Sequence, residues 1–426
     1  MFTLQVLPLV FLMFALLLAA NWIISLIKKD RIKKEQPQQA EAHRPFPQHV
    51  SYPAKALKPD HLSQEDMDRS VRLAYGEWLA AYMLPDIEAG RAFLRMGVDK
   101  RRMRYFVYAT SIGQGLAMWI STLIAGDDLN AQGRFDRLFA FCQARPSRNQ
   151  FALASGYSMP DVVPSLPAAS RSYGDMLIAY SLLMADKQWG SIGQINYRAE
   201  AQIILQALHE TCIHPESLHV LQGNEVSADD EVQYTSTLSV DYAPAMFDAF
   251  STAKLDPTWP AVSARMAALV HETLRDGNLF PPPSISTTTQ ETPGISQTFT
   301  PENAAFLLNL SLAMLCCPKP EIEAVLETIN HKILESCGGD PGKIVSAYSL
   351  KGEPLSQEPS LAMTAAFAMA SIWQPGQAWV NALWDHLAAS KIDREDTFGA
   401  TMRLLVLMTL SGNLWHPNSK ANQIAG

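Results

Sequence analysis

Two carboxylic acids stand out as groups that could exchange a proton with a substrate. Asp175 lies within the largely apolar segment 171–189, and Glu302 directly follows Thr300 and Pro301. Such a pair could act as general acid and general base. Each also has a structural interpretation, which the sequence favours: Asp175 as a buried carboxylate held by backbone, Asn or Gln donors, and Glu302 as a first-turn acid of a helix.

The elements that must position these groups are predicted to be helices. Apolar residues recur at helical spacing in about a dozen segments, and no convincing strand pair is evident. The segments come in pairs of similar length joined by Pro- and Gly-containing breakers, which is typical of α-hairpins. The predicted helices span roughly 66–96, 109–126, 131–144, 172–186, 197–212, 242–253, 258–275, 302–316, 319–336, 359–373, 376–389 and 397–411.

One short segment is similar to a known active-site motif. It runs from Ser111 to Met118 and reads Ser-Ile-Gly-Gln-Gly-Leu-Ala-Met. It resembles the Ser-Glu-Gly-Gln-Gly-Tyr-Gly-Met segment of family 8 glycoside hydrolases, the group that holds bacterial endoglucanases and the cellulase encoded beside cellulose synthase genes. In that family the Glu is the general acid. Ile112 stands in its place.

A second segment extends the resemblance over most of a helix. It begins Arg-Ser-Tyr-Gly-Asp at Arg171 and continues to Trp189. The family's signature helix opens with Ala-Ser/Thr-Asp-Gly-Asp, so Tyr173 stands where the first active-site Asp is expected, and Asp175 matches the second. Residues 240–245, 300–305 and 404–417 agree more loosely; in the second of these, Glu302 and Ala305 replace an Asp and an Arg of the family.

The resemblance implies an (α/α)6 barrel of about twelve helices over residues 54–417, with a groove that contains Gln114, Tyr173, Asp175 and Tyr242. No catalytic residue is expected there, because Ile112 has no proton to give and general acid catalysis usually contributes on the order of 10² to 10⁴ in rate. Asp175 and Glu302 are the residual carboxylates. Among the aromatic residues near the groove, Trp119 and Trp189 are predicted to be core, whereas Tyr242 is predicted to offer a stacking face.

These features predict a catalytically inactive scaffold or accessory protein of a bacterial envelope machine, either exopolysaccharide synthesis or a secretion or conjugation apparatus, that acts by binding protein partners. The alternative is a β-glucan hydrolase or glycan-binding protein, of the cellulose type, that faces the periplasm. A structural domain without a ligand is a third interpretation. Fold alone does not decide among them.

The N-terminus predicts an anchor in the bacterial inner membrane. Val6–Ile27 is a nearly continuous apolar run, and its length as a helix, roughly 33 Å, would cross a bilayer. The expected layout is therefore an anchor at 1–28, a basic and then Pro/Gln-rich tether at 29–53, and a flexible tail at 418–426. The basic residues that follow the run favour a cytoplasmic domain: Lys28, Lys29, Arg31, Lys33 and Lys34.

Composition excludes several other classes. The formal net charge of −8 argues against nucleic-acid binding. The sequence lacks the GxxxxGK[ST], GxGxxG and HExxH motifs, so no nucleotide, cofactor or metal is expected. The five cysteines contain no CxxC pair and are interpreted as free thiols.

Overall fold

The computed structural model describes residues 40–88, 90–101, 104–160, 167–254, 257–275, 277–288, 296–316, 318–373 and 376–419. The predicted membrane anchor, the basic residues after it and residues 420–426 of the predicted tail lie outside this range. Within it, no helix combines the length and the apolar character needed to cross a membrane. The chain divides into a unit of residues 1–40 and a unit of residues 41–426, and the second carries the fold described below.

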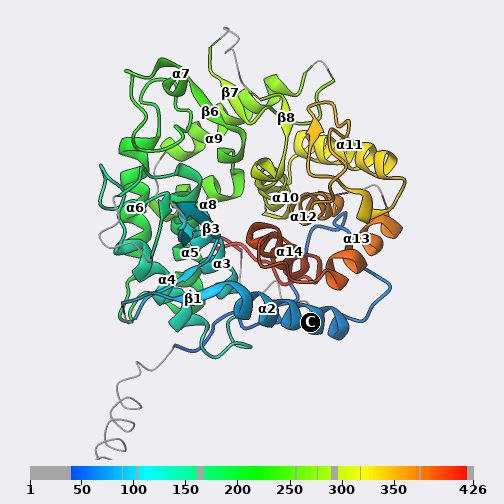
Figure 1. Cartoon of the computed structure of the whole chain (residues 1–426), viewed down its shortest axis with the longest axis horizontal. Helices are drawn as coiled ribbons and strands as arrows, with labels where there is room; N and C mark the ends of the chain where they lie inside the picture. Colours follow the sequence, from blue (N-terminus) through cyan, green and yellow to red (C-terminus); the bar gives the residue numbers. More distant parts are fainter. Residues whose placement is uncertain are drawn as a thin grey trace, which may run out of the picture. The chain divides into compact units, whose positions relative to one another are not determined.

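Six helices form a closed inner ring in which each helix packs against the next and the last packs against the first. Their middle stretches are buried on all sides, as expected of helices that are apolar around their whole circumference. Figure 1 shows them gathered about the centre of the molecule. In chain order they are α3 (Ser111–Leu123), α5 (Ser172–Trp189), α8 (Pro244–Lys254), α10 (Ala305–Cys316), α12 (Leu361–Ser371) and α14 (Thr397–Leu410).

Six further helices form an outer layer, and each packs against a member of the inner ring. They bury one face only, which is why their sequences alternate apolar and polar residues at helical spacing. They are α2 (Gln64–Tyr82), α4 (Ala131–Gln143), α6 (Tyr197–Cys212), α9 (Thr258–Thr273), α11 (Pro320–Cys337) and α13 (Gln377–Ala389). Together the two layers make an (α/α)6 barrel, which confirms the predicted fold class; the single-turn helix α7 (Glu231–Tyr234) is additional.

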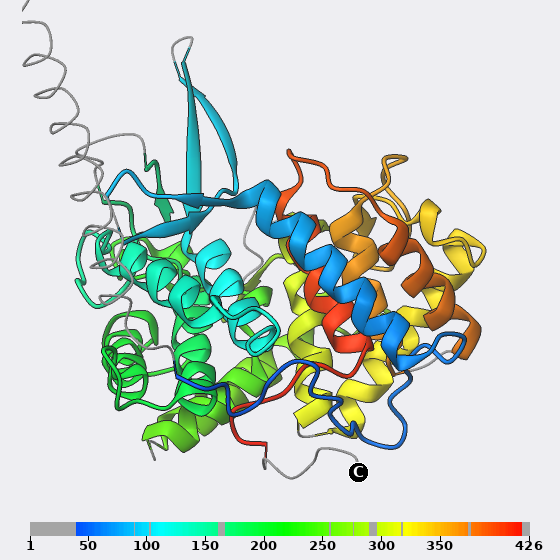
Figure 2. The same cartoon turned by 90° about the horizontal axis from the view of Figure 1, so that it is seen from below.

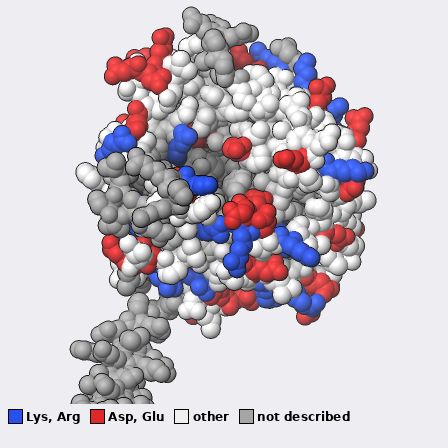
Figure 3. All heavy atoms as spheres, viewed as in Figure 1, with Lys and Arg blue, Asp and Glu red and all other residues white. Residues whose placement is uncertain are grey.

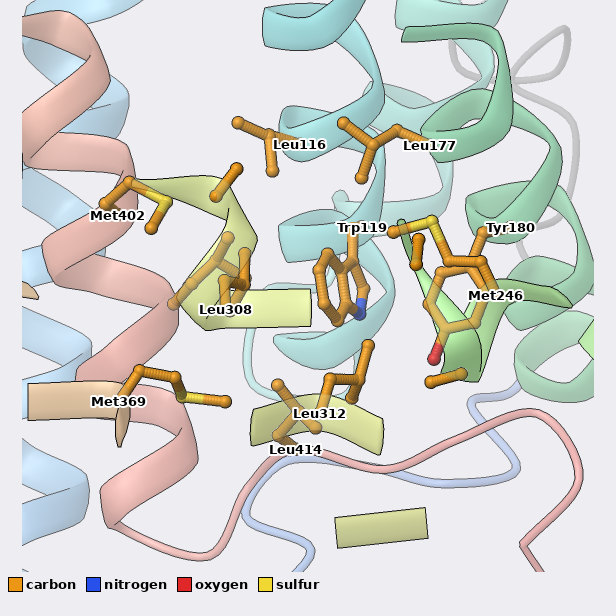
Figure 4. Packing of buried hydrophobic residues seen from close by; sticks show 14 of the residues in the cluster. Leu116, Trp119, Leu177, Tyr180, Met246, Leu308, Leu312, Met369, Met402 and Leu414 are labelled. Atoms are coloured by element: carbon orange, nitrogen blue, oxygen red, sulfur yellow. The ribbon is translucent and has the colours of Figure 1, made fainter. Parts of the chain in front are cut away.

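The centre of the barrel is a packed core. Trp119 of α3 and Tyr180 of α5 meet edge to face, with ring centroids 5.4 Å apart. Trp119 is fully buried and Trp189 is 5% exposed, so the prediction that both are core residues is confirmed. Figure 4 shows side chains from the inner helices, and Leu414 from the segment after α14, converging on the same space: Leu116, Leu177, Met246, Leu308, Leu312, Met369, Met402 and Leu414.

Short antiparallel strands decorate the barrel, so the expectation of no strand pair is wrong. The predicted helix over 66–96 ends at Tyr82, and the apolar residues after it form a strand pair instead, because Pro85 and Asp86 interrupt the helical pattern. The paired strands are β1 (Met83–Pro85) with β2 (Ala92–Leu94), β3 (Gly97–Arg101) with β4 (Arg104–Thr110), β4 with β5 (Tyr157–Ser158), β6 (Ser236–Leu238) with β7 (Ser284–Ser286), and β8 (Thr298–Phe299) with β9 (Tyr348–Ser349).

Residues 43–50, called the strap here, lie across the C-terminal ends of inner helices. Gln188 at the end of α5 accepts the Arg44 N–H at 2.7 Å, and its amide donates to the carbonyls of Arg44 and Thr122 at 2.8 and 2.7 Å. Residues 41–53 were expected in a flexible tether, but helix C-termini present unpaired carbonyls that polar residues satisfy. The start of the compact unit therefore moves from residue 54 to Glu41.

Candidate active-site groove

The β3–β4 hairpin leads directly into α3 and fixes where that helix begins. Thr110, the last residue of β4, caps the helix by accepting the Gly113 N–H on its hydroxyl oxygen at 3.1 Å. Figure 2 shows the hairpin projecting from the end of the barrel where α3 starts. Ile112, one residue after the helix start, is half-buried and packs against the barrel core. The positive end of the helix dipole would stabilise a negatively charged side chain at this position, but the side chain of Ile112 is apolar.

Two glycines bring the first turns of α3 and α5 together. A Cβ on Gly115 would lie 2.5 Å from Cβ of Leu177, and a Cβ on Gly174 would lie 2.9 Å from the Ile112 nitrogen. No larger residue fits either position without moving a helix. The close contact therefore lies between the backbone at Ile112 and Gly174, the residue that follows Tyr173 in the first turn of α5.

Tyr173 is tied into the barrel rather than left free. Its side chain is 3% exposed, and its hydroxyl donates to Oδ1 of Asn309 in α10 at 3.0 Å. The Asn309 amide in turn donates to the carbonyl of Val240 at 2.9 Å. Burial raises the pKa of the Tyr173 phenol, so the residue stays protonated at neutral pH. It therefore supplies neither the charge nor the basicity of the Asp that the resemblance expects at this position.

Asp241 is a carboxyl group at this end of the barrel that sequence reasoning missed. It ends the 3-10 helix η1 (Ser239–Asp241) and is 1% exposed. Burial raises its pKa to about 8, and the Arg171 charge acts in the opposite direction. Asp241 also raises the pKa of Tyr173 electrostatically, so the two groups are near one another. Oδ2 of Asp241 has no hydrogen-bond partner among the described residues. The available signal was an acid directly before Tyr242 in a largely apolar stretch.

Asp175 belongs to α5 but does not join Tyr173. Two residues turn an α-helix by roughly 200°, so the two side chains leave opposite sides of α5. Asp175 is fully buried, and its Oδ1 accepts the Ala154 N–H at 2.8 Å. Burial raises the pKa of Asp175 to about 8, while the Ala154 amide and the Ser170 hydroxyl lower it. This is the backbone-held carboxyl of the structural interpretation.

The other predicted site residues have structural contacts of their own. Glu302 is exposed in η2 (Pro301–Asn303), where its Oε2 accepts the Thr300 hydroxyl at 2.5 Å. Gln114 is 1% exposed and accepts the Leu94 N–H at 2.7 Å, which fixes β2 on α3. Tyr242 is 4% exposed. Contact of Gln114, Tyr173, Asp175 and Tyr242 with a glycan stays a prediction.

The barrel end that carries α3's first turn is hollowed. Figure 3 shows this face, with a depression near its middle and both basic and acidic side chains around it. The two positions at which the resemblance places acid–base chemistry, Ile112 and Tyr173, carry no carboxyl group. No group of three His, Cys, Asp or Glu residues that could hold a metal occurs in the part of the chain that the structure describes.

A two-layer α-barrel with a hollow at the N-terminal end of its inner helices defines the class of protein. The profile of "Glycosyl hydrolases family 8" matches residues 99–309. Residues 99–309 are therefore similar to this family, and the matched range includes both Ser111–Met118 and Arg171–Trp189.

Relatives along almost the whole chain agree with this assignment. A β-glucanase of Niallia circulans is 28% identical over 399 residues, covering 88% of this chain and 92% of its own. An endoglucanase of Bacillus sp. (strain KSM-330) is 28% identical over 398 residues, covering 89% and 83%. The solved structure of a β-1,3-1,4-glucanase from Paenibacillus sp. X4 superposes with a TM-score of 0.80 at 25% identity, over 88% of this chain and 100% of that one.

Proposed function

We propose that this protein is a family 8 barrel that does not hydrolyse glycans by the family's acid–base mechanism and instead serves as a scaffold or accessory protein. The observation that carries the proposal is the pair of residues at the two positions: Ile112 in the first turn of α3 has an apolar side chain, and Tyr173 in the first turn of α5 has its hydroxyl held by Asn309. An inverting glycosidase needs one protonated and one ionised carboxyl group about 6.5 to 9.5 Å apart. Neither position offers one.

We place the protein in the bacterial inner membrane, single-pass, with the barrel in the cytoplasm. What supports this is the sequence of Val6–Ile27 and the basic residues that follow it. Its partners would be proteins of an envelope machine, in exopolysaccharide synthesis or in secretion or conjugation. A reporter enzyme fused after Gly426 tests the orientation, because a periplasmic reporter should be silent on the cytoplasmic side.

The experiment for the proposed function measures the release of reducing ends from carboxymethylcellulose and mixed-linkage β-glucan by the full-length protein in detergent. We expect no release above the no-enzyme control. An Ile112→Glu, Tyr173→Asp double variant restores both carboxyl groups and should gain activity. Gain in the variant alone would identify the missing groups as the reason for inactivity, whereas release by the natural protein would contradict the proposal.

A second candidate, a β-glucan hydrolase with a rearranged acid, is favoured by one observation. Asp241 lies near Tyr173 and carries a pKa raised to about 8, so it holds a proton at neutral pH as a general acid must. The relatives described above are also named as glucanases. The same assay separates the two candidates. Reducing-end release that is lost in the Asp241→Asn variant, and kept in the Asp229→Asn variant at an exposed position, would establish the glucan hydrolase.

A further inference from the structure

The β3–β4 hairpin has a free strand edge within the described part of the chain. The order of strands in its sheet is β3–β4–β5, so β4 pairs on both sides, whereas β3 pairs only with β4. Every second residue of an edge strand directs its N–H and C=O groups away from the neighbouring strand. Figure 2 shows the hairpin standing clear of the helices. It therefore offers a row of backbone donors and acceptors to an incoming strand.

The base of the hairpin is fixed to the barrel, whereas its outer part is exposed. Val107 packs against a small apolar cluster that contains Phe141. Tyr108 stacks on Tyr157, with ring centroids 5.1 Å apart. Further from the barrel, Tyr105 has 69% of its surface exposed. A ribbon that is already held in strand geometry lowers the entropy cost of binding, because the partner does not have to order it.

One face of the ribbon combines apolar surface with a lysine. Residues that lie opposite one another in the two strands share a face, so the register places Val98 beside Val107 and Lys100 beside Tyr105 on this face. Val98 is 37% exposed, and Nζ of Lys100 lies 5.6 Å from the centre of the Tyr105 ring. A strand added to β3 would place alternate side chains along this face.

The hairpin is basic, and its charge selects what can pair with it. Lys100, Arg101 and Arg104 hold strand positions towards its outer end. Asp99 is the only acid in the sequence from 97 to 110, and its Oδ2 accepts the Tyr157 hydroxyl at 3.0 Å. Positive charges on an edge strand oppose its pairing with a second copy of itself and favour its pairing with an acidic strand.

We infer that the β3 edge binds an extended, acidic segment of a partner protein as an additional strand; the inference rests on the proposed function, in which the chain acts by binding partners. Strand addition takes its affinity from main-chain hydrogen bonds and its selectivity from alternate side chains. Acidic side chains of the segment would lie beside Lys100. Because β4 leads directly into α3, the partner would be held at the groove end of the barrel.

The experiment uses the full-length protein in detergent and a blocked octapeptide in which Val and Glu alternate. A second peptide has Gln in place of each Glu, which removes the charge and keeps the shape. Two further peptides keep every Glu and carry N-methyl groups on the backbone nitrogens of either the odd or the even residues. N-methylation removes backbone donors without changing the charge. Isothermal titration measures the affinity of each peptide.

Strand addition predicts two results. The Glu peptide should bind at least about tenfold more tightly than the Gln peptide at low salt, because several cross-strand charge pairs together are worth roughly that factor. One N-methylated peptide should lose at least about tenfold in affinity and the other should not, because only alternate residues face β3. Equal binding of the Glu and Gln peptides would overturn the inference. Equal binding of the two N-methylated peptides would also overturn it, since that indicates attraction of any polyanion, such as an anionic lipid surface.

Two variants locate the binding. Lys100→Glu reverses the charge at an exposed position of β3, so it should weaken binding of the Glu peptide and strengthen binding of a peptide with Lys in place of each Glu. Lys187→Glu makes the same change at an exposed position in the last turn of α5 and should leave both affinities unaltered. An affinity for the Glu peptide that is equal in Lys100→Glu and in the natural protein would contradict the proposed location.

Failure of this inference and failure of the proposed function can be told apart. Reducing-end release reports on the groove, and peptide titration reports on the hairpin. A protein that hydrolyses glucan and also binds the Glu peptide as a strand would overturn the proposed function and leave the docking edge standing. A protein without hydrolysis and without such peptide binding would do the reverse.

Discussion

The two ends of the inner helices differ in how completely their buried polar groups are hydrogen-bonded, although Oε1 of Gln48 in the strap also lacks a partner among the described residues. At the C-terminal end, Gln188 makes three hydrogen bonds to the strap and to α3, and Asn413 donates to Asp68 at 2.9 Å while accepting the Gln48 N–H at 2.7 Å. At the N-terminal end, Oδ2 of Asp241 and Oγ of Ser111 are buried without a partner among the described residues.

The difference indicates what each end is for. Buried polar groups that serve stability are normally satisfied, because an unpaired one costs about 1 to 3 kcal/mol. Unsatisfied groups persist where a site once needed, or still needs, them for a ligand. The C-terminal end is therefore the more completely hydrogen-bonded end of the barrel, and the N-terminal end leaves buried oxygens of Asp241 and Ser111 without partners among the described residues.

The largest expected effect comes from the C-terminal end. Gln188→Ala removes three hydrogen bonds from a fully buried side chain, leaves their partners unpaired and opens a small cavity, so it should lower the free energy of unfolding by about 2 to 4 kcal/mol. Urea unfolding followed by circular dichroism measures this. Gln206→Ala, at an exposed position of α6, is the control and should change stability by less than about 0.5 kcal/mol. A loss at Gln188 no larger than at Gln206 would break the comparison.

A smaller, pH-dependent effect is expected at the groove end. Because burial raises the folded-state pKa of Asp241 to about 8, the folded protein keeps this proton while the unfolded chain releases it from about pH 4 upward. Its contribution to stability is thus present at low pH and is lost as the pH rises towards 8. Asp241→Asn removes this loss.

Denaturant unfolding at pH 5 and at pH 8 measures the effect. The Asn variant should gain at least about 1 kcal/mol relative to the natural protein between the two pH values, the equivalent of somewhat less than one pKa unit. The exposed Asp229→Asn should show no such gain. A pH-independent difference at Asp241 would mean that the carboxyl group is already paired, and the contrast between the two ends would then weaken.

The smallest effect separates two neighbouring hydroxyl groups. Ser111→Ala deletes a buried hydroxyl with no partner among the described residues and should change stability by less than about 0.5 kcal/mol. Thr110→Ala deletes the helix cap and should cost about 1 kcal/mol. Thermal unfolding of the two variants side by side resolves this difference, and equal losses would show that Ser111 is satisfied in solution.

The fold was largely predictable because helical periodicity is a local property. Apart from the single-turn α7, the helices from α3 to α14 match the predicted segments except at their ends, where caps such as Thr110 decide the boundary. The strands of two to seven residues were not predicted, because they are too short to show a clear alternation of apolar and polar residues. The strap was not predicted to be part of the fold, because its polar residues form hydrogen bonds with helix ends that are distant in the sequence. No local sequence pattern reports such contacts.

The candidate site was predictable in part. The resemblance placed Ile112 and Tyr173 in one pocket, and the structure brings the Ile112 backbone against Gly174, the residue after Tyr173. Asp241 was missed, because the signal in the sequence, an acid directly before Tyr242 in an apolar stretch, reports neither its burial nor its nearness to Tyr173. Asp175 was correctly interpreted as backbone-held.

The contact between α3 and α5 also bears on how family members are recognised. Gly115 and Gly174 make it with backbone atoms, so it is indifferent to which side chains stand at positions 112 and 173. Catalytic acids can therefore be exchanged there in either direction while the barrel keeps its geometry. Superposition on a glucanase, however close, shows that the backbone fold is shared. The chemistry depends on the side chains at positions 112 and 173, which the shared backbone does not determine.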